Sequence, residues 1–145
     1  MTPERFAIDT DSCTFEGTPV HKIPWPGLKP PGFAFMANIY LRDALWEDFL
    51  SGEPQPITLA YLFHEHTHVE RLGKDLKSQL AYWLKRDYRF REELAAIENE
   101  MAVLKQYEED FDVDKRARQL SGFPYLWCAD YETARDRLSL LWETE

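Results

Sequence analysis

The chain has 145 residues, of which 44% are hydrophobic and 14% aromatic, so it can bury the core of one domain without covalent staples. Its formal net charge of −9 argues against nucleic acid or an anionic membrane as a partner, because both reward clustered lysine and arginine. The two cysteines, Cys13 and Cys128, have no C-x-x-C spacing and are expected to be unpaired thiols; the alternative is a disulfide between them. No apolar run has the length of a signal peptide or a membrane span, which predicts a cytoplasmic protein.

Residues 1–42 are rich in proline and glycine, which divide this part of the chain into short extended pieces. We expect short strands at 6–8 and 19–23. The clearest strand is 32–41, where alternate positions are large and apolar: Phe33, Phe35, Ala37 and Ile39. This region is therefore expected to be strand-rich.

The remainder, 43–145, is predicted to be helical. Apolar spacing and stop signals indicate helices at 43–50, 56–72, 76–84, 91–110 and 131–142. Pro56 suits a first helical turn, Gly73 suits a helix end, and Asp112 and Asp130 suit N-caps. The sequence thus predicts one α+β domain over 1–145, with a small strand region packed on a helical part.

The segment His64-Glu65-His66-Thr67-His68 contains the pattern H-E-x-x-H. Residues four apart lie on one face of a helix, so the imidazoles of His64 and His68 can bind one metal ion. Glu65 is rotated to the side, where it can accept a proton from water instead of binding the metal. Neutral imidazoles suit zinc, and two of them leave room for a third ligand and water.

The residues around this motif make its helix apolar nearly all round, which indicates burial. Two histidines and a glutamate in that setting are costly unless they are paired, and a metal ion is an economical partner. The alternative is a helix whose histidines only form hydrogen bonds. His66 points away from the other two, so we expect a core histidine bonded to Glu70, one turn further on.

No histidine follows His68, so the third ligand is expected to be a carboxylate. The helix after Tyr88 offers four candidates: Glu92, Glu93, Glu98 and Glu100. Helical angles place Glu93 and Glu100 at the margin of its apolar stripe, whereas the other two point toward solvent. A carboxylate at a buried margin favours a cation, so Glu93 ranks first, then Glu100 and Glu98. The alternative is that these glutamates only make the helix soluble.

These residues resemble the zincin metallopeptidases of the gluzincin type, whose third ligand is a glutamate on a later helix. The segment 64–70 is similar to their H-E-x-x-H-V-x-Q signature, with Glu70 in place of glutamine. Residues 37–42 look like the edge strand before their motif helix, and 88–96 looks like the segment with their ligand glutamate, which matches Glu93. The resemblance covers about 32–104. It implies a minimal zincin-like fold and a zinc site of His64, His68 and Glu93.

Two features depart from that family. Leu94 follows Glu93 where a small residue is usual, and no downstream histidine is present to stabilise an oxyanion. A tyrosine would have to do so, and the candidates are Tyr82, Tyr88, Tyr125 and Tyr131.

The expected activity is zinc-dependent hydrolysis of a peptide or protein substrate, with Glu65 as the base and with the strand near Tyr40 available to pair with extended peptide. Two rivals are a zinc-stabilised binding or structural module of a larger assembly and a helical interaction domain without metal. A base at position 65 speaks against the module, because a purely structural site has no use for one.

Overall fold

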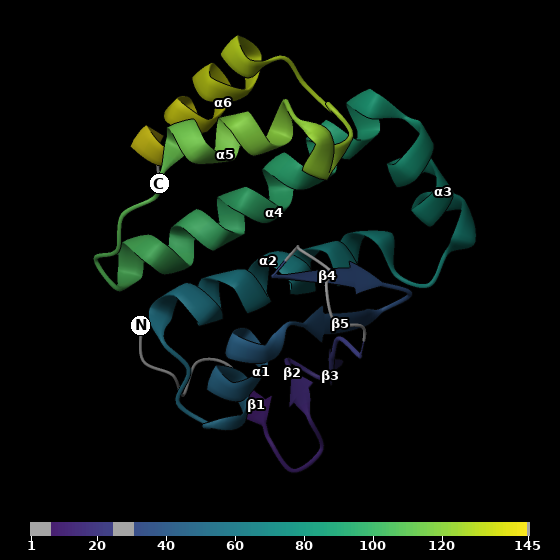
Figure 1. The fold of residues 1–145 in the computed structure, drawn as a ribbon, viewed down its shortest axis with the longest axis vertical. Coiled ribbons are helices and arrows are strands. Elements are labelled where there is room, and N and C mark those ends of the chain that lie inside the picture. The colour runs from purple at the N-terminus through teal and green to yellow at the C-terminus, as the bar shows by residue number, and fades with distance from the viewer. Residues whose placement is uncertain (1–6, 25–30, 145) are drawn as a thin grey trace.

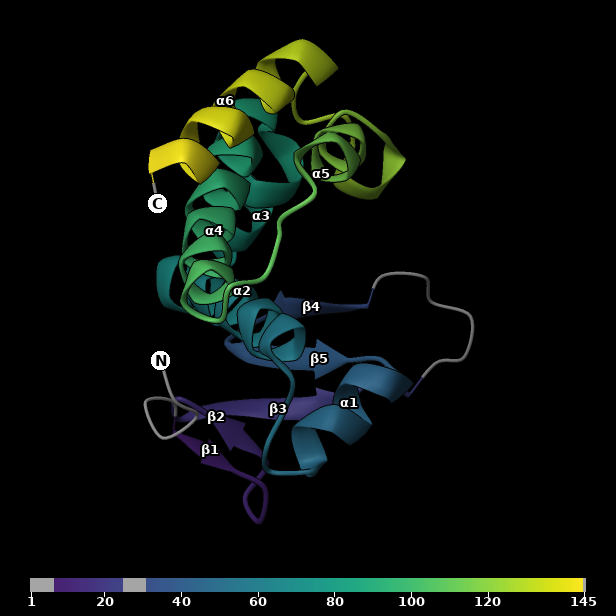
Figure 2. The same ribbon diagram turned by 90° about the vertical axis from the view of Figure 1, so that its left-hand side faces the viewer.

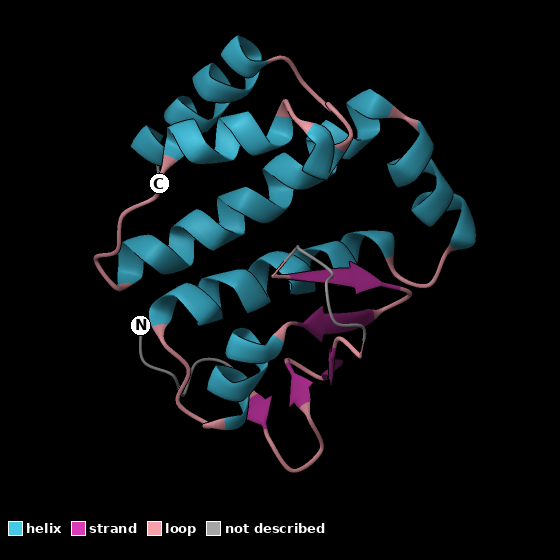
Figure 3. Ribbon diagram, viewed as in Figure 1, coloured by secondary structure: helices cyan, strands magenta, loops and turns pink. Residues whose placement is uncertain are grey.

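The computed structural model describes residues 7–24 and 31–144, in which a mixed five-stranded sheet from the N-terminal part is followed by six α-helices (Figures 1 and 3). The strands are β1 (Ile8–Asp9), β2 (Thr14–Phe15), β3 (Thr18–Lys22), β4 (Gly32–Phe35) and β5 (Asn38–Leu41). The predicted α+β class is confirmed. Of the strand expected at 6–8, Ile8 belongs to β1, and Phe6 lies outside the described residues.

The single strand expected at 32–41 is wrong, because the chain turns back at Met36 and Ala37. Both residues have positive φ, 50° and 64°, and β4 and β5 pair antiparallel with Phe35 opposite Asn38. The Asn38 side chain donates to the Met36 carbonyl and supports the turn. Such turns usually contain glycine or asparagine at their centre. The unbroken apolar alternation and the absence of those residues at 36 and 37 concealed the hairpin.

The hairpin also changes which strand lies at the edge of the sheet. The strand order is β1-β2-β3-β5-β4, and β5 is parallel to β3 and antiparallel to β4. The expectation that 37–42 forms an edge strand is therefore wrong, since β5 is paired on both sides. Among the described strands β4 is the one at this edge, and it packs beside the helix with the histidine motif (Figure 2).

The helices are α1 (Asp43–Leu50), α2 (Pro56–Leu72), α3 (Leu76–Leu84), α4 (Arg86–Gln106), α5 (Val113–Leu120) and α6 (Tyr131–Thr144), with a 3-10 turn, η2 (Phe123–Tyr125), before α6. Asp112 caps α5 by accepting from Lys115 N–H, and Asp130 accepts from Thr133 N–H at the start of α6. Both predicted N-caps are confirmed.

The fourth predicted helix, 91–110, has shifted ends. It begins at Arg86 because buried Arg89 donates to the carbonyls of Tyr82 and Trp83 at the end of α3, which holds the first turn of α4 against it. It ends at Gln106 because Glu108 has a φ of 57° and the next N–H returns to the Leu104 carbonyl. Such an ending is usually marked by glycine, which is absent here.

Helix α4 lies between two hydrophobic clusters. Val103 and Leu104 contribute to the cluster formed with the sheet, α1 and α2, while Ile97 and Met101 contribute to the cluster formed with α5 and α6. Figure 2 shows α4 between α2 and the last two helices. Because α4 has neighbours on opposite sides, several of its charged residues are buried, and these form the candidate site described below.

Two smaller expectations concern the thiols and the membrane. Cys13 and Cys128 are unpaired, as predicted. Within the described residues, none of the helices combines the length and apolar character that crossing a bilayer requires.

Candidate metal centre

His64, His68 and Glu93 meet at the interface between α2 and α4. The two histidines lie one turn apart on α2, and their ring centroids are 4.9 Å apart. Glu93 reaches them from α4, so that one ligand atom from each of the three residues lies within 4.8 Å of the others. All three side chains are buried, and Glu93 is only 1% exposed. The structure thus brings together the three residues that the sequence singled out as metal ligands.

The hydrogen bonds of His64 favour a cation at this point. Its Nδ1 lies 2.8 Å from Glu100 Oε1, and since an ionised carboxylate only accepts, Nδ1 carries the proton and donates it. Neutral His64 then turns the lone pair of Nε2 toward Glu93 Oε1, which is 3.3 Å away. Two acceptors in this position repel one another unless a proton or a metal ion lies between them.

Without a metal ion, a proton on His64 Nε2 removes this repulsion, and the surroundings of His64 favour that proton. Burial by itself lowers the pKa of an imidazole, but the adjacent carboxylates of Glu100 and Glu93 outweigh it and raise the pKa of His64 to about 10. The metal-free ring is therefore held as a cation. A bound metal ion would replace the proton on Nε2 and supply the same positive charge.

The second oxygen of Glu93 faces the imidazole of His68, as the first faces that of His64. His68 Nε2 lies 2.7 Å from Glu93 Oε2, so the carboxylate bridges the two imidazoles. Burial by itself raises the pKa of Glu93, but the neighbouring imidazoles, His68 foremost, hold it well below its usual value. Glu93 Oε1 and His68 Nδ1 are buried without a hydrogen-bond partner. A buried carboxylate whose two oxygens each face an imidazole nitrogen fits the donor set of a zinc site.

Glu100, the second-ranked ligand in the sequence, lies behind His64 instead of beside the metal position. It accepts from His64 Nδ1 and also from Arg116 of α5, whose Nη1 and Nη2 lie 2.9 and 2.8 Å from its two oxygens. Burial opposes ionisation, yet Arg116 and His64 lower the pKa of Glu100 to about 2. A carboxylate in this position fixes the ring and tautomer of a histidine ligand.

Of the four candidate tyrosines, Tyr82 is the one with a hydrogen bond to a residue of the triad. Its hydroxyl donates to Glu93 Oε2 at 2.6 Å, and its ring packs edge-on against His68. Tyr82 therefore holds the carboxylate of Glu93 in place. Tyr131, in contrast, bonds to Asp114 at the surface, and Tyr88 lies against Arg91. Tyr125 is close enough to Glu93 and Arg116 for their charges to affect its pKa, which burial raises.

Glu65 lies beside the triad without belonging to it. Its Oε1 is 3.9 Å from His64 Nε2, and its side chain is buried. Burial raises the pKa of the Glu65 carboxyl, although the nearby histidines act in the opposite direction. Tyr61, one turn earlier on α2, stacks on His64 and donates to the Gly32 carbonyl of β4. A side chain that can accept a proton therefore stands next to the metal position.

His66 has the core role predicted for it. Its Nε2 lies 2.8 Å from Glu70 Oε1, one turn further along α2, and its Nδ1 lies 3.0 Å from the Thr18 hydroxyl of β3. Phe15 packs edge-on against the ring. His66 thus links α2 to the sheet, on the side of the helix away from the triad.

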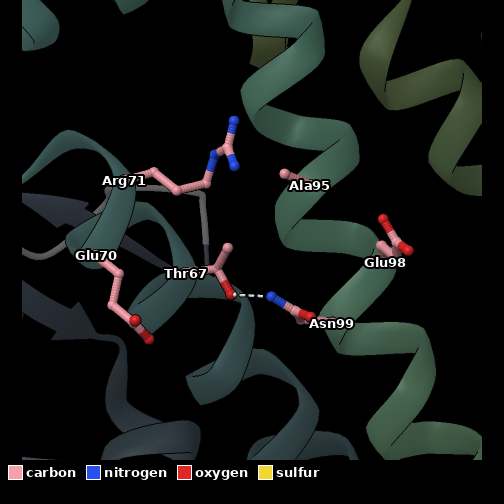
Figure 4. A pocket seen from close by; sticks show the side chains of 6 residues that line it. All are labelled: Thr67, Glu70, Arg71, Ala95, Glu98 and Asn99. Atoms are coloured by element: carbon pink, nitrogen blue, oxygen red, sulfur yellow. Dashed lines mark hydrogen bonds between the residues drawn. The ribbon is translucent and has the colours of Figure 1, made fainter.

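The two remaining glutamates of α4 have different surroundings. Glu98 is exposed, as predicted, and lines a pocket of about 300 Å³ between α2 and α4. Figure 4 shows this pocket, in which Thr67 and Asn99 are joined by a hydrogen bond; none of its lining residues belongs to the triad. The expectation that Glu92 faces solvent is wrong. It is buried and accepts two hydrogen bonds from Arg71, which reaches across from α2.

Arg116 and Tyr61 are the site residues that the sequence analysis missed. Tyr61 had a usable signal, because it lies four positions before Glu65 on the same helix and therefore on the same face. Arg116 had none, since nothing in the sequence of α5 indicates which helix it packs against.

Comparisons with protein families, with curated proteins and with solved structures found no match for this chain. The zincin resemblance therefore has only the motif residues and their geometry to support it.

Proposed function

We propose that this chain is a zinc-dependent hydrolase that cleaves peptide bonds. The observation that supports it is the meeting of His64, His68 and Glu93 within 4.8 Å, with Glu93 Oε1 buried and without a hydrogen-bond partner. Two imidazoles and one carboxylate are a common donor set of catalytic zinc sites, which keep one position open for water or substrate. Zinc held there would polarise a substrate carbonyl and lower the pKa of a water molecule.

The protein's own side chains would handle the proton. Glu65 would accept it on a carboxylate oxygen when water adds to the amide carbon, and would return it to the nitrogen of the leaving amine. The raised pKa of Glu65 suits this role, because the best proton carriers have a pKa close to the working pH. Glu100 and Arg116 would keep His64 in the tautomer that offers Nε2 to the metal.

Strand β4 is the element on which an extended substrate would be aligned. It borders the sheet next to α2, and in the described residues its ladder partner is β5 alone. A peptide that pairs with its outer side would run past the motif helix. This assignment replaces the strand near Tyr40, whose two sides are already used.

Metal analysis and activity assays on matched variants test the proposal. Purified wild-type protein is expected to contain about one zinc per chain and to cleave an unfolded protein substrate. Glu65→Gln should retain the metal and lose the activity, whereas His64→Ala/His68→Ala should lose both. Glu70→Gln, on the exposed side of the same helix, is the control and should behave as wild type. Folded wild-type protein that binds no zinc, or activity that survives in Glu65→Gln, would contradict the proposal.

A zinc-stabilised module without activity is a second candidate, and the burial of the site favours it. All three donor residues are 6% exposed or less, and the pocket between α2 and α4 does not include them. Buried Glu65 argues for the hydrolase, because a closed structural site gains nothing from an extra buried carboxylate. If wild type and Glu65→Gln bind zinc equally and neither cleaves peptides, the module is the correct function.

A further inference from the structure

The helix α3 presents an apolar face to solvent. Its four large apolar residues occupy one side of the helix at positions i, i+4, i+7 and i+8 and are 48% to 77% exposed: Leu76, Leu80, Trp83 and Leu84. The opposite side carries Gln79 and Tyr82, which face the protein. A surface helix normally buries its apolar stripe, so this one is reversed.

A second set of exposed apolar side chains lies in the segment that Arg89 connects to the end of α3. The segment around η2 exposes Phe123, Leu126 and Trp127. Arg89 joins the two regions by donating both to carbonyls at the end of α3 and to those of Tyr125 and Leu126, and Arg86 donates to the Trp127 carbonyl. We call these seven apolar residues of α3 and 123–127 the α3 surface. Figure 1 shows α3 at the periphery of the molecule.

The charge around the α3 surface is opposite to that of the whole chain. Residues 74–91 contain six basic and two acidic residues, a net charge of +4 in a chain of net charge −9. Five of the six cations are exposed: Lys74, Lys77, Lys85, Arg86 and Arg91. Within the described part of the chain, no carboxylate lies within ion-pair distance of the three lysines. The positive charges of these three lysines are therefore available to a partner.

We propose that the α3 surface binds the surface of an anionic lipid bilayer. Exposed leucine and tryptophan flanked by lysine and arginine are typical of helices that lie in the bilayer interface, with tryptophan at the level of the headgroups. The cations complement anionic headgroups. Each basic residue near the bilayer surface increases the affinity for the membrane by about fivefold. The earlier expectation against an anionic membrane used the net charge, which averages over this basic segment.

Two other occupants fit the observations less well. A symmetric second copy would bring the same basic residues of both chains together, which is unfavourable. A peptide helix requires a groove, and the pocket of about 300 Å³ lies between α2 and α4 instead. No residue of the α3 surface belongs to the His64–His68–Glu93 triad, so lipid binding there is independent of the proposed activity.

Co-sedimentation of the full chain with vesicles tests the proposal. The protein is expected to bind vesicles of phosphatidylcholine mixed with phosphatidylserine much more tightly than phosphatidylcholine alone, and the binding should weaken with added salt. Lys77→Glu/Lys85→Glu should reduce the affinity by at least about 25-fold. The matched control is Lys115→Glu/Arg137→Glu, at exposed positions of α5 and α6, which makes the same charge change outside the α3 surface and should have much less effect.

The apolar contribution is tested separately. Trp83→Ser/Leu84→Ser should reduce binding by at least about tenfold, whereas Leu140→Ser, at an exposed apolar position of α6, should leave it unchanged. Circular dichroism establishes that each variant is folded. Failure of the wild type to bind anionic vesicles at low salt would overturn the proposal, as would equal loss in the α3 and control variants. Concentration-dependent self-association that Trp83→Ser/Leu84→Ser abolishes, without vesicle binding, would instead identify a contact between copies of the chain.

Discussion

Arg116 and Glu100 form a two-pronged ion pair in which both oxygens of the carboxylate accept from one guanidinium. Glu100 in turn accepts from His64 Nδ1, so a residue of α5 controls the orientation of a proposed ligand on α2 without touching the metal position. Arg116→Met should therefore lower zinc affinity by about 10- to 100-fold, the usual cost of losing a residue that supports a ligand. Competition with a chromophoric chelator measures this.

Arg118→Met is the control for that experiment. Arg118 lies on the same helix and pairs with Asp114, but its side chain is exposed. It should bind zinc as the wild type does. Equal affinities in the two variants would show that the Arg116–Glu100–His64 chain has no part in metal binding.

Glu93→Gln should weaken zinc binding more than Glu98→Gln does. Glu93 supplies a donor atom within 4.8 Å of both histidine donors, whereas Glu98 lines the separate pocket at the surface. The loss for Glu93→Gln should exceed the roughly 10- to 100-fold cost of removing a supporting residue. Zinc titration of both proteins by calorimetry decides the order, and the reverse order would show that another side of α4 faces the metal.

The stability of the metal-free protein should depend on pH in a defined window. The pKa of His64 is raised from 6.5 to about 10, so its contribution is fully present below pH 6.5 and is lost as the pH rises through 10. The pKa of Glu100 is lowered from 4.5 to about 2, so its contribution is present above pH 4.5 and is lost as the pH falls through 2. As far as His64 and Glu100 are concerned, the metal-free protein is most stable between pH 4.5 and pH 6.5. Thermal unfolding in the presence of a chelator measures this dependence.

The stabilisation of the protein by added zinc should increase with pH, whereas the stability of the metal-free protein decreases on the alkaline side. Metal binding displaces protons from the imidazoles, so the rise in unfolding temperature caused by zinc should increase from pH 6 to pH 8. At a free zinc concentration of a hundred times Kd the stabilisation is about 2.7 kcal/mol. A shift that does not change with pH would indicate that zinc binds to groups other than His64 and His68.

Gly32→Ala should destabilise the fold. A Cβ atom at this position would lie 2.4 Å from the Tyr40 carbonyl oxygen of the paired strand and 3.0 Å from the Tyr61 ring. Displacing packed backbone typically costs about 1–3 kcal/mol, which thermal unfolding should detect. Adding Tyr61→Leu should not rescue the variant, because the closest clash is with backbone. Rescue by Tyr61→Leu would show that the added Cβ atom clashes mainly with the Tyr61 ring and not with the Tyr40 carbonyl.

The sequence predicted the local features of this protein well and the contacts between elements poorly. The spacing of His64 and His68 and the helical angle of Glu93 follow from the geometry of single helices, and the structure brings these residues together. Glu92 was assigned to solvent because its own helix gives no sign of Arg71, which reaches it from α2. The β4–β5 hairpin was missed because its turn, at Met36, lacks the usual residues. Such features depend on packing partners that the pattern of one segment does not reveal.

Because α4 belongs to both hydrophobic clusters, an ion held jointly by α2 and α4 would act as a cross-link between the sheet-bearing half and the helical half. Such a link restricts how far the halves can separate before the protein has unfolded as a whole. The loaded chain would then lose its structure in a single cooperative transition, while in the chelated chain α4 would separate from α2, together with α5 and α6, at a lower temperature than the sheet unfolds.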